Sequence, residues 1–394
     1  MKLLATTVLC FGLVGTGVMA QSVPCGGNFN TFMKNVGVEA AQKGISDKGI
    51  RMVTAAARPS SRVLKRDRGQ GVFRKSFLEF SARAVSQNRL DRAAQMRRKY
   101  SSTFARAQRD FGVPPEVILA FWAMETDFGA FMGDFNTLSA LATLAHDCRR
   151  PGLFRPQLLA AMTLVGRGDM DPAVTGAWAG EIGHVQMLPG DILERGMDGD
   201  GDGRVRLKTS APDAIVSAAN MLRYHGWRPG EPWIVEVTTP DNLNWGQTGF
   251  AAPRKVSDWA RAGVKPRSGS LPSGNLDAAL LVPQGRKGPK FLAFHNFTNV
   301  YLEWNKSLVN TTTAAYLATR IGGAPRYLKG NPEPALSDEQ MFTLQKRLKA
   351  RGHDVGKVDA ILGRLTRAAV RAEQTRLGMP ADGWPTTQLL AALR

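Results

Sequence analysis

One glutamate lies on the apolar face of a predicted helix. The stretch from Pro114 to Gly129, PPEVILAFWAMETDFG, predicts a helix with Pro114 near its first turn and Gly129 at its stop. Glu125 falls on the apolar stripe, four residues after Phe121 and three before Phe128. Burial disfavours the charged carboxylate and raises its pKa towards the range useful for proton donation. Glu125 is therefore the candidate general acid, and a glutamate paired with an arginine or held by backbone donors is the alternative.

A second group of acids has the spacing of a calcium loop. The segment DGDGDGRVRLKT places Asp at its first, third and fifth positions and Gly at its sixth, where a hard cation finds several oxygen ligands on a tight turn. Position twelve is Thr209 instead of a bidentate Glu, so Asp213 is expected to close the site. The alternative is a solvated acidic turn. The candidate ligands are Asp198, Asp200, Asp202, Arg204 and Asp213.

A glycine-containing segment between the Glu125 helix and the acidic loop carries polar side chains. It reads AWAGEIGHVQMLPGDIL, and Gly180 and Gly183 allow a backbone to approach another element or a ligand closely. Gln186 and His184 supply polar groups, although a hydrogen-bonded structural role is the better interpretation for His184.

The N-terminus has the pattern of a secretory signal. Lys2 precedes an apolar run from Leu3 to Val18, and small residues ending at Ala20 offer a cleavage site, so residues 1–20 are expected to be removed. The alternative is an uncleaved anchor. No integral membrane span is expected after cleavage.

Removal of this segment leaves two cysteines, Cys25 and Cys148. An even number in an oxidising compartment favours one disulfide between them, and the alternative is two unrelated buried thiols.

The net positive charge of the chain indicates which class of partner it binds. The 394 residues carry a formal net charge of +19 with a pI near 10.3, which favours an anionic partner. Because an exported protein rarely meets nucleic acid, we expect an envelope polymer or an anionic membrane surface as the partner, and no nucleic acid.

The elements that position these groups are mainly helical. Helical spacing dominates from Cys25 to about Gly112, including a basic helix from about Asp91 to Phe111. Its arginines, such as Arg92, Arg97 and Arg98, are interpreted as a solvated face. Pro, Gly and short apolar runs predict a small β-rich insertion over about 228–294, before a last helix from about Ser307 to Arg320.

The end of the chain predicts a separate module. Residues 325–336 form a polar linker with two prolines, and residues 337–394 follow as three helices. Ser337 and Gln340 make a capping box, Thr366 is expected to cap the second helix, and Thr386 helps to open the third.

These motifs together carry a family resemblance. METDFG, GDFNTLSALATLA, AGEIGHVQMLP, the calcium-like loop and NMLRYHGW resemble the lytic murein transglycosylase B family in order and spacing, from about Cys25 to Ile321. The tail LQKRLKARGHDVGKVDAILGRLTRAAV resembles a peptidoglycan-binding module of cell-wall hydrolases. The resemblance implies a lysozyme-like helical catalytic domain over residues 21–324, with the peptidoglycan-binding domain at 337–394.

The family's single catalytic glutamate falls on Glu125. The implied reaction cleaves the bond between N-acetylmuramic acid (MurNAc) and N-acetylglucosamine (GlcNAc) in the periplasm. Glu125 donates its proton to the glycosidic oxygen and then helps the muramic acid's own hydroxyl to close a 1,6-anhydro ring. Glycan strands and other cell-wall enzymes are the implied partners. No cofactor is expected for the chemistry, and calcium would be structural.

The sugar-site residues of the family carry over unevenly. A tyrosine, a serine and a second tyrosine of the family pattern are replaced by Trp304, Ala177 and Met221. In the tail, Ala360 replaces a glycine and Glu373 an aromatic residue, so that module is expected to bind glycan weakly or to act as a spacer. The positions that line the sugar site by resemblance are Gln186, Arg149, Arg150, Trp304, Asn305, Gly180 and Gly183.

Two other functions remain open at this point. A hydrolytic muramidase needs a second carboxylate, and no acid other than Glu125 stands on a comparable apolar stripe near it. A non-catalytic wall-binding scaffold is motivated by the three replacements in the sugar site.

Overall fold

The computed structural model describes residues 23–69, 75–250 and 253–394. The predicted signal segment at 1–20 lies outside these residues. Within them, no helix combines the length and the apolar character needed to cross a bilayer.

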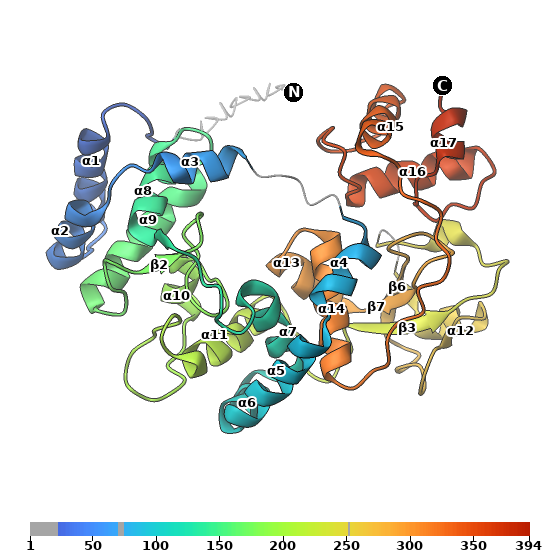
Figure 1. Cartoon of the computed structure of the whole chain (residues 1–394), viewed down its shortest axis with the longest axis horizontal. Coiled ribbons are helices and arrows are strands. Elements are labelled where there is room, and N and C mark those ends of the chain that lie inside the picture. The colour runs from blue at the N-terminus through green and yellow to red at the C-terminus, as the bar shows by residue number, and fades with distance from the viewer. Residues whose placement is uncertain (1–22, 70–74, 251–252) are drawn as a thin grey trace, which may run out of the picture.

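The first part of the chain is helical, as the sequence predicts. Its helices are α1 (Phe29–Gln42), α2 (Asp47–Ala56), α3 (Ser61–Arg68), α4 (Phe77–Ala84), α5 (Gln87–Lys99), α6 (Ser101–Phe111), α7 (Pro115–Thr126), α8 (Thr137–His146), α9 (Pro151–Arg167), α10 (Pro189–Arg195) and α11 (Ala211–Tyr224). Two short strands, β1 (Phe135–Asn136) and β2 (Thr175–Gly176), pair beside α8. Figure 1 shows α1, α2, α8 and α9 gathered on one side of the molecule, with α5, α6, α7 and α11 below its centre.

The expected β-rich insertion is a five-stranded antiparallel sheet in the order β4-β6-β7-β3-β5. The strands are β3 (Ile234–Thr238), β4 (Arg254–Lys255), β5 (Lys265–Pro266), β6 (Asp277–Leu281) and β7 (Phe291–Ala293). The two faces of this sheet pack against different hydrophobic cores. Leu281 and Phe291 face the helical core, whereas Leu280 and Leu292 face a smaller core against α12 (Val256–Arg261). The alternation follows from the two-residue period of a strand.

The short 3-10 helix η1 (Trp245–Gln247) lies between β3 and β4. After the last strand, the π-helical turn η2 (Asn296–Tyr301) leads into α13 (Leu302–Trp304). The long helix α14 (Leu308–Ile321) then packs against α7 and α4. A π-helical turn shifts the angle at which later side chains leave the helix, and here it precedes Trp304.

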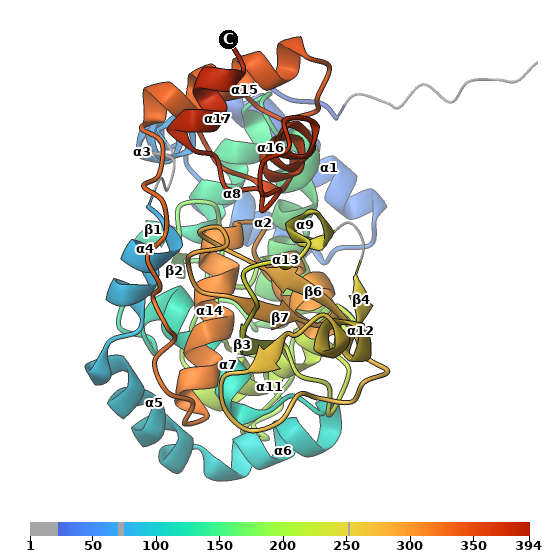
Figure 2. The ribbon, with the colours of Figure 1, turned by 90° about the vertical axis from the view of Figure 1, so that its right-hand side faces the viewer.

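The C-terminal module has its own apolar core and three helices: α15 (Asp338–Ala350), α16 (Arg364–Arg376) and α17 (Thr387–Ala392). It lies next to the sheet, and Figures 1 and 2 place it at the top of the molecule. The backbone amide of Arg286 donates to Asp382 at 2.8 Å, and Arg367 donates to the carbonyl of Pro283 at 2.6 Å. The buried Arg367 guanidinium also lies over the Trp384 ring. The module is therefore docked on the loop between β6 and β7.

The segment predicted as a linker is also held in place. The Tyr327 hydroxyl lies 2.8 Å from that of Ser81, and its ring packs 4.6 Å from the Tyr316 ring. The amide of Leu328 donates to Glu236 at 2.7 Å.

Three local predictions are wrong. The basic helix expected over 91–111 is two helices, α5 and α6, which meet at Tyr100. The helix that carries Glu125 ends at Thr126 instead of Gly129, because Asp127 and Phe128 adopt left-handed backbone conformations. Thr366 does not cap α16, which begins at Arg364; its buried hydroxyl bonds to the carbonyl of Val355.

Candidate active site

Glu125 lies in the last turn of α7, a helix that is apolar on all sides. Val117, Ile118, Leu119 and Ala120 are each 0% exposed, so the helix is buried on every face and the predicted single stripe is wrong. The Glu125 carboxyl is only partly exposed and opens onto a cavity of about 210 Å³. The cavity is lined by Phe80, Phe121, Met124, Glu125, Tyr301, Trp304, Asn305, Asn310, Thr311 and Ala314.

Burial raises the pKa of Glu125 from an ordinary value of 4.5 to about 7. The hydrogen bond from Trp304 opposes this shift because it stabilises the carboxylate, and the nearby charge of Glu181 adds to it. Near neutral pH both forms of Glu125 are populated, which suits a group that must donate a proton and then accept one.

Trp304 is held over the acid by aromatic packing. Its indole Nε1 donates to Oε1 of Glu125 at 3.0 Å. The indole ring lies 4.5 Å from the Phe121 ring, which in turn lies 4.7 Å from that of Tyr301. Asn305 lines the same cavity, and its side chain accepts from the amide of Ser307. The structure therefore brings Trp304 and Asn305 to Glu125.

The residues after Glu125 lock this helix end to the 182–187 segment. The Thr126 hydroxyl donates to the carbonyl of His184 at 2.6 Å and accepts from the amide of Gly129 at 3.0 Å. Gly129 has φ +86°, and a Cβ there would stand 2.5 Å from the His184 ring. Only glycine satisfies both conditions.

His184 serves this contact as a structural histidine. Its Nδ1 accepts from the indole Nε1 of Trp122 at 3.1 Å, and burial lowers the pKa of the ring. The interpretation of His184 as a hydrogen-bonded structural residue agrees with these contacts.

Asp127 carries an ion-pair network that the sequence interpretation missed. Arg89 and Arg92 of α5 donate to its two carboxylate oxygens at 3.1 and 2.6 Å, and Arg92 also donates to its backbone carbonyl at 2.9 Å. The assignment of Arg92 to a solvated face is therefore wrong, and Arg97 pairs with Glu116 at the other end of α7. The three-residue spacing of Arg89 and Arg92 on one helix face was the available signal.

Glu181 is a second acid near Glu125, and its proximity was also missed. Its charge raises the pKa of Glu125, and its own pKa is raised by burial and lowered by Arg150. Among the described residues, none donates a hydrogen bond to its buried Oε2 atom. Glu181 does not line the cavity in front of Glu125.

Gly180 and Gly183 flank Glu181, with φ +95° and +78°. A Cβ on Gly180 would meet the Leu141 side chain at 2.3 Å, and one on Gly183 would meet the carbonyl of Leu207 at 2.3 Å. These glycines thus allow close approach to other parts of the protein. Gln186 adopts φ 52°, and its Nε2 donates to the carbonyl of Gly183 at 2.8 Å.

The arginine pair does not line the Glu125 cavity. Arg149 donates to Oδ2 of Asp67 at 2.6 Å, and Arg150 bonds to Oδ1 of the same carboxylate, which is 3% exposed. Arg150 also acts electrostatically on Glu181. A disulfide joins Cys25 to Cys148, directly before this pair.

The acidic loop brings only part of its predicted ligand set together. Asp198, Asp200 and Asp202 each offer an oxygen within 4.8 Å of the others. Asp213 is not part of this group, and its two oxygens accept from the amides of Gly199 and Arg206 at 2.8 and 2.7 Å. It holds two parts of the loop together, and its role as a ligand stays a prediction.

Arg204 stands at position seven, where a calcium loop supplies a backbone carbonyl. Its side chain points elsewhere, to the carbonyl of Arg167 and to Asp169.

The two replacements in the C-terminal module have structural effects. Ala360 adopts φ 65°, which explains the usual glycine, and its amide donates to Gln345 at 2.8 Å. Glu373 is buried and pairs with His353 and Arg376 at 2.8 and 2.7 Å, so it does not offer a surface contact.

Comparison with known proteins agrees with this architecture. Residues 28–319 match the transglycosylase SLT domain, and residues 337–393 match a putative peptidoglycan-binding domain. Membrane-bound lytic murein transglycosylase B of Escherichia coli strain K12 is 29% identical over 209 residues, 52% of this chain. The match spans 56% of that relative's length.

SltB3 of Pseudomonas aeruginosa is similar over nearly the whole chain. Its crystal structure in complex with NAG-anhNAM-pentapeptide is 34% identical and covers 94% of this chain and 100% of that chain, with a TM-score of 0.86. A second SltB3 structure, in complex with NAG-NAM-pentapeptide, is 33% identical with the same coverage and the same TM-score.

Proposed function

Because the chain belongs to the transglycosylase SLT family and ends in a peptidoglycan-binding domain, we propose that it is a peptidoglycan lytic transglycosylase that leaves 1,6-anhydroMurNAc ends. The observation that carries this proposal is the partly buried Glu125, with a pKa raised to about 7, on the wall of a cavity. The SltB3 complexes with sugar–pentapeptide ligands support the substrate class.

Glu125 acts twice in this reaction. Its proton passes to the glycosidic oxygen as the bond from MurNAc C1 to that oxygen breaks, which releases the GlcNAc hydroxyl. The C6 hydroxyl of the same MurNAc then bonds to C1, and its proton returns to the Glu125 carboxylate. No water is consumed, and the acid ends in its starting form. Trp304 stabilises the intermediate carboxylate through its 3.0 Å hydrogen bond.

Hydrolysis by a muramidase mechanism is the second candidate, because Glu181 lies near Glu125. Two-carboxylate hydrolysis needs both groups to face the sugar. Glu181 does not line the cavity of Glu125, which favours the intramolecular hydroxyl as nucleophile.

The proposal includes export to the periplasm. The apolar segment before Ala20 and the Cys25–Cys148 disulfide both support an oxidising compartment. It also includes a structural calcium ion, held by Asp198, Asp200 and Asp202 with the carbonyl of Arg204. Calcium would neutralise three converging carboxylates and fix the loop that precedes α11.

Mass spectrometry of digested peptidoglycan tests the reaction. Wild-type protein is compared with Glu125→Gln, and with Glu116→Gln as a matched control at the other end of α7. We expect anhydro-ended muropeptides from the wild type and the control, and none from Glu125→Gln. Reducing ends would establish the hydrolase instead. Retained wall binding without any cleavage product would favour the scaffold.

A further inference from the structure

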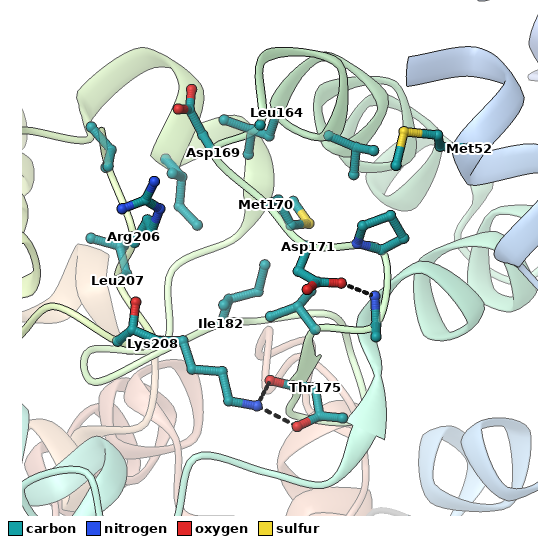
Figure 3. A pocket seen from close by; sticks show the side chains of 18 of the residues that line it. Met52, Leu164, Asp169, Met170, Asp171, Thr175, Ile182, Arg206, Leu207 and Lys208 are labelled. Atoms are coloured by element: carbon teal, nitrogen blue, oxygen red, sulfur yellow. Dashed lines mark hydrogen bonds between the residues drawn. The ribbon is translucent and has the colours of Figure 1, made fainter. Parts of the chain in front are cut away.

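A cavity of about 580 Å³ lies behind the segment that contacts the catalytic helix. Its walls come from α2, the end of α9, the chain from 169 to 175 and the chain from 205 to 209. None of the residues lining the Glu125 cavity contributes to it. Figure 3 shows Met170, Ile182 and Leu207 among the apolar side chains that line it, with Lys208 reaching to Thr175 and the Asp171 carboxylate beside them.

Lys208 is a cation on the wall of this cavity, and no ion pair to it is found within the part of the chain that the structure describes. Its Nζ donates to the carbonyl of Thr175 at 2.7 Å and also contacts the Thr175 hydroxyl, both of them neutral groups. Burial lowers the pKa of the Lys208 ammonium. A lysine has three N–H donors, so one remains for a ligand.

Asp171 supplies the opposite charge. Its Oδ1 accepts from the backbone amide of Ala173 at 2.7 Å, and no ion pair to it is found among the described residues. Arg206, also on the wall, already pairs with Asp202, and Asp169 is contacted by Arg204. The cavity thus offers the cations of Lys48 and Lys208 and the anion of Asp171 to a ligand, beside an apolar surface.

We propose that this cavity binds a short peptide that carries both carboxylate and ammonium groups. A carboxylate of the peptide pairs with Lys208, its ammonium pairs with Asp171, and its aliphatic parts contact Met170, Ile182 and Leu207. The cavity volume of about 580 Å³ suits a peptide of a few residues. The stem peptide of peptidoglycan has this chemistry, and its identification as the ligand rests on the proposed function.

Hydrogen bonds connect the wall of this cavity to the end of the helix that carries Glu125. The amide of His184 donates to the carbonyl of Leu207 at 3.0 Å, and Gly183 lies directly against the same carbonyl. The His184 carbonyl in turn accepts from Thr126, the residue after Glu125. A peptide held by Lys208 therefore contacts the segment that fixes the end of the catalytic helix.

The test is a calorimetric titration of the mature protein with the free tetrapeptide L-Ala-γ-D-Glu-meso-diaminopimelate-D-Ala. Asp171→Asn removes charge but keeps an acceptor for Ala173, and Lys208→Met keeps the aliphatic stem. Lys255→Met and Asp277→Asn break an ion pair in the β-rich insertion and serve as matched controls. We expect each cavity variant to weaken binding by about tenfold, as the loss of one charge-assisted hydrogen bond does. The controls should bind as the wild type does.

Cleavage assays identify the source of the peptide. Glycan strands with stems are compared with strands from which an amidase has removed them. Asp171→Asn should lower the preference for stem-bearing strands and leave cleavage of bare strands unchanged. Unchanged binding in both cavity variants, with normal melting temperatures, would overturn the site.

If the variants bind the free peptide more weakly but keep the preference for stem-bearing glycan strands, the site binds free peptides. That result would overturn the identification of the ligand as a stem attached to the glycan. The titration involves no bond cleavage, so a failure of the proposed transglycosylase reaction would leave its result intact.

Discussion

Trp304 donates a hydrogen bond from its indole Nε1 to Oε1 of Glu125, at 3.0 Å, across a separation of 179 residues in the chain. The bond stabilises the charged carboxylate, whereas burial stabilises the neutral acid. The balance of these two effects sets the pH range in which the acid can donate its proton.

The pH dependence of cleavage should follow Glu125. Because the protonated form begins the reaction, kcat/KM should fall above a pKa of about 7, with the slope of a single proton. Trp304→Phe removes the bond to the carboxylate and should move this fall to higher pH, by roughly one unit. Rates on a soluble glycan from pH 5 to pH 9 measure the shift, and movement to lower pH would contradict the assigned role.

Glu181→Gln should shift the same profile in the opposite direction. Removing a nearby negative charge makes the Glu125 carboxylate easier to form, so its pKa should fall. Glu194→Gln, on the exposed side of α10, is the control and should leave the profile unchanged. An unshifted profile for Glu181→Gln would mean that the two carboxylates do not interact.

Glu125 should reduce the free energy of unfolding at neutral pH. Its folded pKa of about 7 exceeds the ordinary 4.5, so stability is fully present below pH 4.5 and is lost as pH rises through 7. Glu125→Gln should be more stable than the wild type at pH 8 by on the order of 2 kcal/mol, with little difference at pH 4.5. Urea unfolding at both pH values checks this, and equal differences at both would exclude the raised pKa.

Arg92→Met should lower kcat more than it changes KM. Arg92 makes two contacts with Asp127, which ends α7, and it does not line the Glu125 cavity, so we expect it to position Glu125 and not to bind substrate. A misplacement of the acid should reduce kcat by roughly tenfold or more. Arg97→Met, which breaks the pair with Glu116 on the same two helices, is the control and should have little effect. Equal losses in both variants would point to general destabilisation.

Calcium should raise the melting temperature, because an ion that binds only the folded loop stabilises it by mass action. Chelation should reverse the rise, and Asp200→Asn should abolish it, since Asp200 is one of the three converging acids. Asp213→Asn should lower the melting temperature with and without calcium, because Asp213 bonds to the amides that close the loop. A wild-type protein that melts at the same temperature in calcium and in chelator would remove the ion from the proposal.

Local patterns predicted much of this architecture. The helical lobe, the β-rich insertion, the Ser337 capping box and the helix that carries Glu125 all follow from patterns within short windows, although the single apolar stripe predicted for that helix does not hold. The pairing of Arg92 with Asp127 and the approach of Glu181 to Glu125 join segments 35 and 56 residues apart, and no short window of sequence shows which acid each group meets. Asp213 has the residue type of a calcium ligand, and only the fold shows that its oxygens accept from the amides of Gly199 and Arg206.

The burial of α7 on every side determines when the entropic cost of ordering Glu125 arises. A catalytic side chain on a loop must be brought to order again in every turnover, at an entropic cost. Glu125 extends from a helix whose neighbours Leu119, Ala120 and Ala123 are wholly enclosed by the core. The ordering of the acid is therefore completed once, when the chain folds, and each cycle of bond cleavage begins with that step already done.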